Sequence, residues 1–347
     1  MNSKKLVRDT IKHTNNYGRI PYFFSAPPGF EDNPDKKLVQ EVKALIQQMP
    51  KDIIMYFGYC PPSDWNPKEN LQKWGLGGNY SDGIDEWGVK WKSTYAIYHP
   101  LEKWEALKNY HFPNPFAPGR LDEAKKLINE NKEKYLLWFF GYSLFERLWS
   151  LRGFENLLMD PYIYPRQFIN LRDRIMEFNV GIIERFLELE FDGVMIGDDL
   201  GSQVSLLMNP TMWRKYYKPC YKEMFDIIHA KGLDVWMHTD GNVTEIIPDL
   251  IEIGLDVLNP VQPSAVDIQY LSREFGNDLS FFGGIDVQTF LPHGTPQIID
   301  KEIKYLIETL GRPDGGYIPA PTNALLSDIP LENIKAALIA LKKYSVR

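Results

Sequence analysis

The chain has 347 residues, of which 44% are hydrophobic and 24% charged, and its formal net charge is -7. This mixture is typical of a globular protein with a large core and argues against a disordered chain. A net negative charge without clustered Lys and Arg also argues against nucleic acid and the membrane surface as partners.

The N-terminal half contains three β-rich runs, at residues 20–24, 52–59 and 135–142. Between the second and the third run, residues 61–120 include seven prolines and are too long for a bare connection. We therefore expect an insertion at residues 61–120, with a β-hairpin around the segment DEWGVKWK (85–92).

In the C-terminal half, five β-rich runs alternate with helical stretches. The runs are residues 191–197, 233–238, 255–260, 279–284 and 315–320. Asn209-Pro210 and Thr295-Pro296 each place a capping residue before a proline, which is typical of a helix start. Asn242 and Glu245 have the spacing of a capping box. Strands that alternate with helices in this way predict a parallel sheet.

Eight strand–helix units in a chain of this length predict an α/β fold, a (β/α)8 TIM barrel formed by residues 1–347 as a single domain. The active site of such a barrel lies at the carboxyl ends of the strands, and the N-terminal insertion would lie over the barrel mouth. A doubly wound sheet is the competing architecture. No strand is followed by a G-x-G-x-x-G or Walker A motif, which favours the barrel.

Cysteine content and the N-terminal sequence bear on the cellular location. The two cysteines, Cys60 and Cys220, lie far apart, so a disulfide framework is not expected and a reducing compartment fits best. The first 16 residues, MNSKKLVRDTIKHTNN, contain no apolar stretch long enough for a signal peptide or a transmembrane helix. We therefore expect a cytoplasmic protein.

Polar residues just past the predicted strands are the candidates for a site at the barrel mouth. They are Tyr59, Tyr142, Asp198, Asp199, His238, Asp240, Gln262, Asp286, Thr322 and Asn323. One histidine among several carboxylates is typical of an acid/base or metal site. For Asp198 and Asp199 a structural interpretation is equally open, because an aspartate after a barrel strand often caps the following helix.

His238 and Asp240 are separated by one residue in DVWMHTDGN (234–242), so both side chains can point into the mouth. Asp240 is not needed as a helix cap, because Asn242 with Glu245 serves that purpose. An imidazole and a carboxylate suit zinc, although catalytic zinc normally has three protein ligands. The alternative is a neutral histidine hydrogen-bonded to a carboxylate. We expect a functional role and take His238 and Asp240 as the candidate metal ligands.

Several longer segments carry a resemblance to a known family. They are FDGVMIGDDLGSQVSLLMNPTMWRKYYKP, HTDGNVTEIIPDLIEIGLDVLNPVQP and FFGGIDVQTFLPHGTP, together with DEWGVKWK, HPLEKWEAL and SLFERLWSLRGFENLL upstream. Through them the chain resembles the uroporphyrinogen decarboxylase superfamily, and more closely the branch that contains corrinoid-dependent methyltransferases. The resemblance covers nearly the whole chain and implies a (β/α)8 barrel with a funnel-shaped site at the carboxyl ends of the strands.

Two departures from the family pattern argue against decarboxylase activity. The decarboxylases carry an arginine-rich RQAGRY segment that binds substrate carboxylates, whereas the corresponding region here reads YFFSAPPGF (22–30). The GHG motif near their C-terminus is replaced by PAPTNAL (319–325). An octacarboxylate substrate would therefore lack its charge-assisted partners.

The methyltransferase members typically use a His-x-Cys motif and a further cysteine near the last strand. His238 matches the histidine, but Asp240 stands where the cysteine would be, and residues 319–325 contain no cysteine. A histidine and carboxylate set makes a harder and more Lewis-acidic zinc site than thiolates do. The resemblance thus implies methyl transfer from an oxygen or nitrogen substituent of a small substrate to a corrinoid on a partner protein.

Under this interpretation His238, Asp240, Asp198, Asp199 and Asp286 are the expected catalytic residues. The expected substrate-binding residues are Tyr59, Tyr142, Gln262 and Asn323. Two alternatives stay open: a cofactor-independent decarboxylase, and a ligand-binding barrel that has lost its metal.

Overall fold

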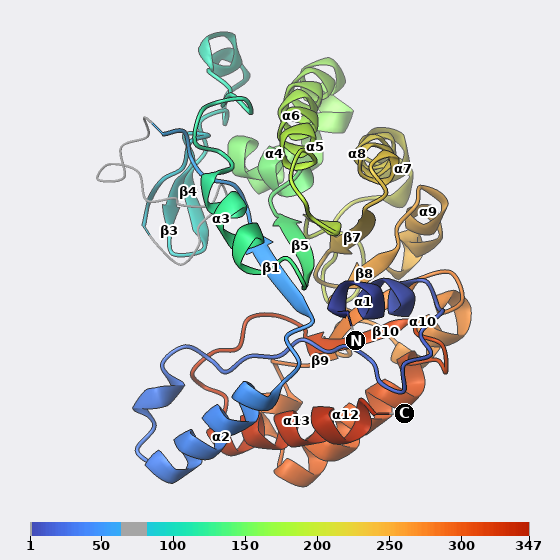
Figure 1. Ribbon diagram of the computed structural model, residues 1–347. Coiled ribbons are helices and arrows are strands. Elements are labelled where there is room, and N and C mark those ends of the chain that lie inside the picture. The colour runs from blue at the N-terminus through green and yellow to red at the C-terminus, as the bar shows by residue number, and fades with distance from the viewer. Residues whose placement is uncertain (1, 64–81, 347) are drawn as a thin grey trace.

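The computed structural model describes residues 2–63 and 82–346 of the chain. Its main feature is a seven-stranded parallel sheet whose strands are neighbours in the order in which they occur along the chain (Figure 1). The strands are β1 (Ile53–Phe57), β5 (Tyr135–Phe140), β6 (Gly193–Gly197), β7 (Asp234–His238), β8 (Val257–Asn259), β9 (Ser280–Ile285) and β10 (Tyr317–Pro321). Sequential parallel pairing with helical connections confirms the predicted α/β architecture, and the sheet curls in the manner of a TIM barrel.

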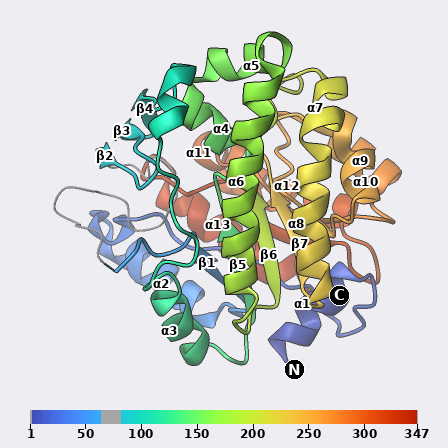
Figure 2. The same cartoon turned by 90° about the horizontal axis from the view of Figure 1, so that it is seen from above.

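Helices surround the curled sheet (Figure 2). They are α1 (Ser3–Ile11), α2 (Lys36–Gln48), α3 (Asp122–Glu130), α4 (Phe145–Arg152), α5 (Phe154–Ile163), α6 (Pro165–Phe186), α7 (Pro210–Tyr216), α8 (Lys218–Ala230), α9 (Ile247–Glu252), α10 (Ile268–Phe275), α11 (Phe290–His293), α12 (Pro296–Leu310) and α13 (Leu331–Tyr344). Short 3-10 helices occupy Phe30–Asp32, Trp104–Asn109 and Thr244–Ile246.

The helix starts follow the capping signals in two of three cases. Asn209 accepts a hydrogen bond from the Thr211 N–H at 2.8 Å, and Thr295 caps α12. The predicted capping box is only half formed, because Asn242 accepts from the Thr244 N–H at 3.1 Å but no bond returns from Glu245 within the described chain. The chain therefore enters α9 through a 3-10 turn.

The predicted strand at residues 20–24 is wrong: this segment is extended but does not join the sheet. It runs beside β10, and the Phe23 N–H donates to the Pro319 carbonyl at 2.9 Å. The Thr322 N–H donates to Ile285 of β9. The backbone groups of successive residues point to opposite edges of a strand, so Pro319 and Pro321 face the other edge of β10, beside residues 20–24. Prolines have no N–H to donate, so this edge cannot form a ladder.

The interior of the curled sheet is filled with large apolar side chains. This cluster contains Val7, Ile11, Ile53, Tyr135, Leu137, Met195, Trp236, Val257, Phe282, Ile318 and Ala320. Two of its members, Val7 and Ile11, come from α1, which is anchored to the start of the sheet by a 2.9 Å hydrogen bond from Ser3 Oγ to Asp52. Each fully buried side chain of this kind contributes about 1.5–3 kcal/mol of transfer free energy. Because α1 and the packed side chains fill the rest of the curled sheet, the carboxyl ends of the strands form its open end.

A small antiparallel sheet lies within the predicted insertion at residues 61–120. It consists of β2 (Gly83–Ile84), β3 (Lys90–Lys92) and β4 (Tyr95–Tyr98), and the β2–β3 pair confirms the predicted hairpin. The Asp85 carboxylate accepts the Trp87 and Val89 N–H groups and pairs with Arg147 of α4 at 3.1 Å. Part of the segment, residues 64–81, lies outside the described residues. The position of the insertion over the barrel mouth stays a prediction.

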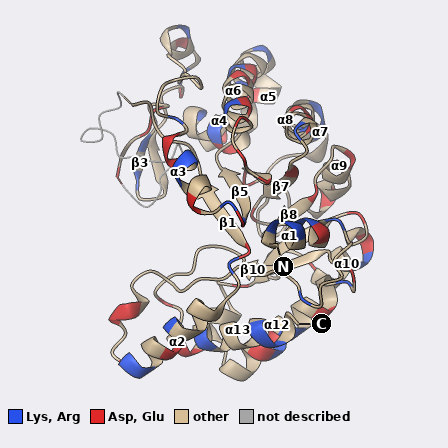
Figure 3. Ribbon diagram, in the orientation of Figure 1, with Lys and Arg blue, Asp and Glu red and all other residues tan. Residues whose placement is uncertain are grey.

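The outer surface carries charges of both signs. Figure 3 shows Lys and Arg interspersed with Asp and Glu on the outer helices. Among the helices of residues 2–63 and 82–346, none combines the length and the apolar character needed to cross a bilayer.

An exposed ion pair at the end of α8 gives a testable pH dependence. His229 Nε2 lies 2.8 Å from Asp256 Oδ2, and this hydrogen bond raises the pKa of His229 against the opposing effect of burial. The stabilisation of the fold by this pair is therefore fully present below the unfolded pKa of about 6.5 and is lost as the pH rises through the folded pKa of His229.

We expect His229→Gln to lower the free energy of unfolding more at about pH 5.5 than at about pH 8.5. The difference should be about 0.5 kcal/mol, because the pair is partly exposed and screened by solvent. Urea unfolding of both proteins at the two pH values measures it. An equal loss at both values would mean that only the neutral hydrogen bond contributes.

Candidate functional site

A cavity of about 470 Å³ lies at the carboxyl ends of the strands. All seven strands of the main sheet contribute to its wall, which consists of Phe23, Ser25, Met55, Phe57, Phe139, Met195, His238, Asn259, Phe282, Pro321, Thr322, Asn323, Ala324 and Leu325. This lining contains four phenylalanines and two methionines but no Lys, Arg, Asp or Glu. The cavity is therefore suited to a small, largely apolar ligand with few polar groups.

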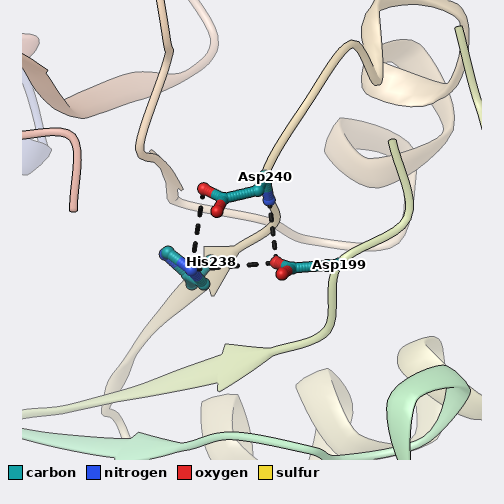
Figure 4. Close-up of side chains that lie close together, drawn as sticks. All are labelled: Asp199, His238 and Asp240. Carbon is teal, nitrogen blue, oxygen red and sulfur yellow. Dashed lines mark hydrogen bonds and ion pairs between the residues drawn. The ribbon is translucent and has the colours of Figure 1, made fainter. Parts of the chain in front are cut away.

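His238 is the polar residue through which the cavity meets a carboxylate cluster. Its Nε2 lies 3.8 Å from Asp199 Oδ1 and 3.8 Å from Asp240 Oδ1. Figure 4 shows the two carboxylates reaching the imidazole from different loops. One nitrogen or oxygen atom from each of the three residues lies within 4.8 Å of the others, which makes them a candidate metal-binding group.

The other side of the His238 ring is held by neighbouring strands. Nδ1 lies 2.6 Å from Asn259 Oδ1, at the directly opposed position of β8. Asn259 Nδ2 donates in turn to the Phe282 carbonyl of β9 at 2.9 Å. The edge of the Phe139 ring packs against the imidazole with the ring centroids 5.6 Å apart. These contacts leave Nε2 directed toward the two carboxylates.

Asp240 is mostly buried, and its two oxygens differ. Oδ2 accepts a hydrogen bond from Asn323 Nδ2 at 3.1 Å, whereas Oδ1 is buried and has no hydrogen-bond partner within the described chain. Burial raises the pKa of Asp240 to about 6; His238 opposes this shift and the charge of Asp199 adds to it. A buried carboxylate oxygen without a partner is unusual and points to a missing cation or proton.

The loops after β6 and β7 pack backbone to backbone, which brings Asp199 to Asp240. The Asp240 N–H donates to Asp199 Oδ1 at 2.9 Å, and the Gly201 N–H donates to the Asp240 carbonyl at 3.2 Å. A Cβ on Gly201 would lie 2.7 Å from the Asn242 nitrogen, and one on Gly241 (φ +84°) would collide with the Gly201 backbone. Both positions therefore require glycine.

Asp198 and Asp199 have different surroundings. The Asp198 carboxylate is fully buried and accepts five hydrogen bonds, from Ser143 Oγ, Tyr221 Oη and the N–H groups of Leu144, Phe145 and Glu146. It thus caps the N-terminus of α4, which precedes β6 in the chain, and so has a structural role, although not at the following helix that the sequence suggested. We remove Asp198 from the candidate catalytic set and retain Asp199.

Asp286 and Gln262 also make local structural contacts. Asp286 accepts hydrogen bonds from the Gln288 N–H at 2.6 Å and from Thr289, and it is not part of the His238 cluster. Gln262 Oε1 accepts from the Gly241 N–H at 2.8 Å and so supports the loop that carries Asp240. Asp286 therefore does not belong to the cluster around His238. Gln262 supports the Asp240 loop and does not line the cavity.

The two candidate tyrosines lie in an aromatic layer outside the cavity wall. Tyr59 is buried, accepts a hydrogen bond from the Trp87 indole at 3.2 Å and packs under Arg120. Tyr142 packs against Trp91, with ring centroids 5.6 Å apart. Among the four predicted substrate-binding residues, Asn323 lines the described cavity, and the tyrosines do not.

Two residues next to the cluster, Asn259 and Glu146, were not predicted from the sequence. Asn259 is the last residue of β8, so the strand-end criterion that selected His238 would also have found it. Glu146 lies in the first turn of α4, where no strand-end pattern marks it. Burial, and then the charges of Asp199 and Asp198, raise the pKa of Glu146 well above its ordinary range.

Comparison with known proteins identifies the family. The family model of uroporphyrinogen decarboxylase (URO-D) matches residues 94–344, and the chain belongs to this family, as its sequence resemblance implied. A methylated-thiol–coenzyme M methyltransferase from Methanosarcina mazei is 24% identical over 146 residues, which cover 42% of this chain and 36% of that relative. The match thus spans about a third of the curated relative.

A solved structure supports the fold over the full chain. A methyltransferase from Methanosarcina mazei aligns with a TM-score of 0.67 and 15% sequence identity, covering 99% of this chain and 98% of that chain. Both relatives are methyltransferases by name, in agreement with the branch that the sequence resembles.

The different surroundings of the two adjacent aspartates can be tested by mutation. Asp198→Asn would place an NH₂ group against N–H donors, and we expect it to lower the free energy of unfolding by about 2–4 kcal/mol. Asp199→Asn is the matched control and should change stability by less than about 1 kcal/mol, because Asp199 accepts one backbone hydrogen bond and is partly exposed. Urea unfolding measures both, and equal losses would refute the assignment.

Proposed function

We propose that the chain is a zinc-dependent methyltransferase that moves a methyl group from an oxygen or nitrogen substituent of a small substrate to a corrinoid on a partner protein. The observation that carries the proposal is the position of His238, whose Nε2 faces two carboxylates at the edge of an uncharged cavity. Membership of the URO-D family and the methyltransferase names of the two relatives support it.

The three side chains fit zinc. Tetrahedral zinc with nitrogen and oxygen ligands at about 2.1 Å places ligand atoms about 3.4 Å apart, and His238 Nε2 lies 3.8 Å from each carboxylate oxygen. Small side-chain shifts would satisfy this geometry, and Asp240 Oδ1 would gain the partner that it lacks. His238, Asp199 and Asp240 would then supply three protein ligands and leave a fourth position open, which is the pattern of catalytic zinc. When bound, zinc acts as a Lewis acid that polarises the substrate heteroatom.

The remaining residues of the site bind the substrate and exclude water. As the methyl group leaves, the electron pair of its bond stays on the heteroatom, so this atom must lie near polar groups of the cavity. The polar side chains of the wall are those of Ser25, His238, Asn259, Thr322 and Asn323, and the rest of the wall is apolar. The walls therefore orient the substrate with its heteroatom toward the carboxylate cluster and its apolar part away from it.

The alternative of a decarboxylase for a polycarboxylate substrate is not favoured. The described lining of the cavity has no Lys or Arg that could pair with substrate carboxylates. The other alternative, a ligand-binding barrel without metal, differs from the proposal in its zinc content, which the following experiment measures.

We expect protein purified without chelator to contain about one zinc per chain, and His238→Ala to lose this zinc together with turnover. The melting temperature of the metal-free forms should differ by a few degrees at most, because His238 is at a strand end and contributes little to the packed interior. Elemental analysis and thermal unfolding of both proteins provide the data.

His293→Ala is the matched control for this experiment. His293 lies at the exposed end of α11, away from the cluster, so its removal should leave the zinc content unchanged. If the wild-type protein and His238→Ala take up equal zinc, His238 is not a metal ligand. A large fall in melting temperature with unchanged zinc would make it a structural residue.

Asp240→Cys separates metal binding from proton transfer. A thiolate is a softer and stronger donor to zinc than a carboxylate, so the variant should bind zinc at least about tenfold more tightly. If Asp240 instead holds a neutral His238 for proton transfer, turnover should fall without any gain in zinc affinity. Zinc titration of the metal-free proteins distinguishes the two, and equal affinity with reduced turnover contradicts the metal assignment.

A further inference from the structure

Asn259 connects His238 to the interior of the sheet through two hydrogen bonds. It is 6% exposed and lies directly opposite His238 in the parallel register of β7 and β8. Its oxygen is 2.6 Å from His238 Nδ1, and its nitrogen is 2.9 Å from the Phe282 carbonyl. The contacts therefore form a chain across three adjacent strands, from the backbone of β9 to the imidazole of β7.

The Phe282 carbonyl determines which way the amide of Asn259 is turned. A carbonyl oxygen only accepts hydrogen bonds, so it requires the NH₂ group of the amide rather than its oxygen. The amide oxygen must then face His238, and this oxygen also only accepts. Nδ1 of His238 therefore carries a hydrogen atom, and in the neutral imidazole Nε2 carries the lone pair.

We infer that Asn259 is a positioning residue that holds neutral His238 in the Nδ1–H form and directs the Nε2 lone pair toward Asp199 and Asp240. Without Asn259, the two carboxylates at 3.8 Å would favour a hydrogen atom on Nε2, because carboxylates accept hydrogen bonds. Asn259 thus opposes the tendency of the two carboxylates to place the hydrogen on Nε2. The consequence for metal binding rests on the proposed function, whereas the form of the imidazole does not.

Nuclear magnetic resonance of ¹⁵N-histidine in the metal-free protein tests the form of the imidazole. The measurement is made at about pH 8.5, where an ordinary histidine is neutral, and the His238 signals are assigned by their loss in His238→Ala. We expect wild-type His238 to carry its hydrogen on Nδ1. Wild-type protein with the hydrogen on Nε2 would overturn the inference.

Two variants of Asn259 separate positioning from packing. Asn259→Leu removes both hydrogen bonds and should move the hydrogen of His238 to Nε2. Asn259→Asp loses the donor to the Phe282 carbonyl but keeps an acceptor opposite Nδ1, so it should retain the Nδ1–H form, even if the Leu variant does not fold. Asn323→Leu is the control: Asn323 contacts Asp240 rather than His238, so the hydrogen of His238 should stay on Nδ1.

Zinc affinity provides the second readout. Residues that orient a histidine ligand typically change metal affinity 10–100-fold, so zinc should bind about 10–100-fold more weakly to Asn259→Leu, with recovery in Asn259→Asp. Unchanged affinity in the Leu variant would overturn the positioning role. If wild-type protein binds no zinc, the proposed function fails, and the resonance experiment still decides the form of the imidazole.

Discussion

The site depends on one backbone contact, between the loop that follows β6 and the loop that follows β7. Gly201 and Gly241 let these loops approach more closely than any side chain would allow, and the Asp240 N–H then reaches Asp199. The contact places two carboxylates near one imidazole, and their proximity contributes to the raised pKa of Asp240. The site is therefore assembled by main-chain packing, and its side chains follow from it.

Assembly of the site by main-chain packing explains which of its residues can be predicted from the sequence. The position after a strand selects His238, Asp199 and Asp240, and the structure brings these three side chains together because the carboxyl ends of parallel strands meet at one edge. The same criterion selects Asp198 and Asp286, whose carboxylates instead accept hydrogen bonds from backbone N–H groups. The donors to Asp198 lie far away in the chain, so a strand-end pattern does not contain them. The donors to Asp286 are the residues that follow it, Gln288 and Thr289.

The fold follows a similar rule. Alternation of strands and helices predicts the seven strands of the main sheet correctly, because each β-rich run is a local sequence pattern. The prediction fails at residues 20–24, because whether this segment joins the sheet depends on the neighbouring strand β10. Pro319 and Pro321 both lie on the edge of β10 that faces this segment, and only the register with β9 reveals this. Asn259 lies at a strand end, as His238 does, but its contact with His238 follows only from the register of β7 and β8.

The arrangement of polarity also restricts the chemistry. The cavity wall has no formal charge apart from that which His238 can carry, and the carboxylates lie behind this histidine and Asn323. Phenyl rings line the cavity and two carboxylates lie 3.8 Å from Nε2, so electrostatic interactions at Nε2 are stronger than they would be in water. A cation held there would be neutralised by the carboxylates, while its open side would face an apolar ligand. Because like charges repel, the two carboxylates disfavour each other without a cation, and this repulsion is a physical reason for the metal site that we propose.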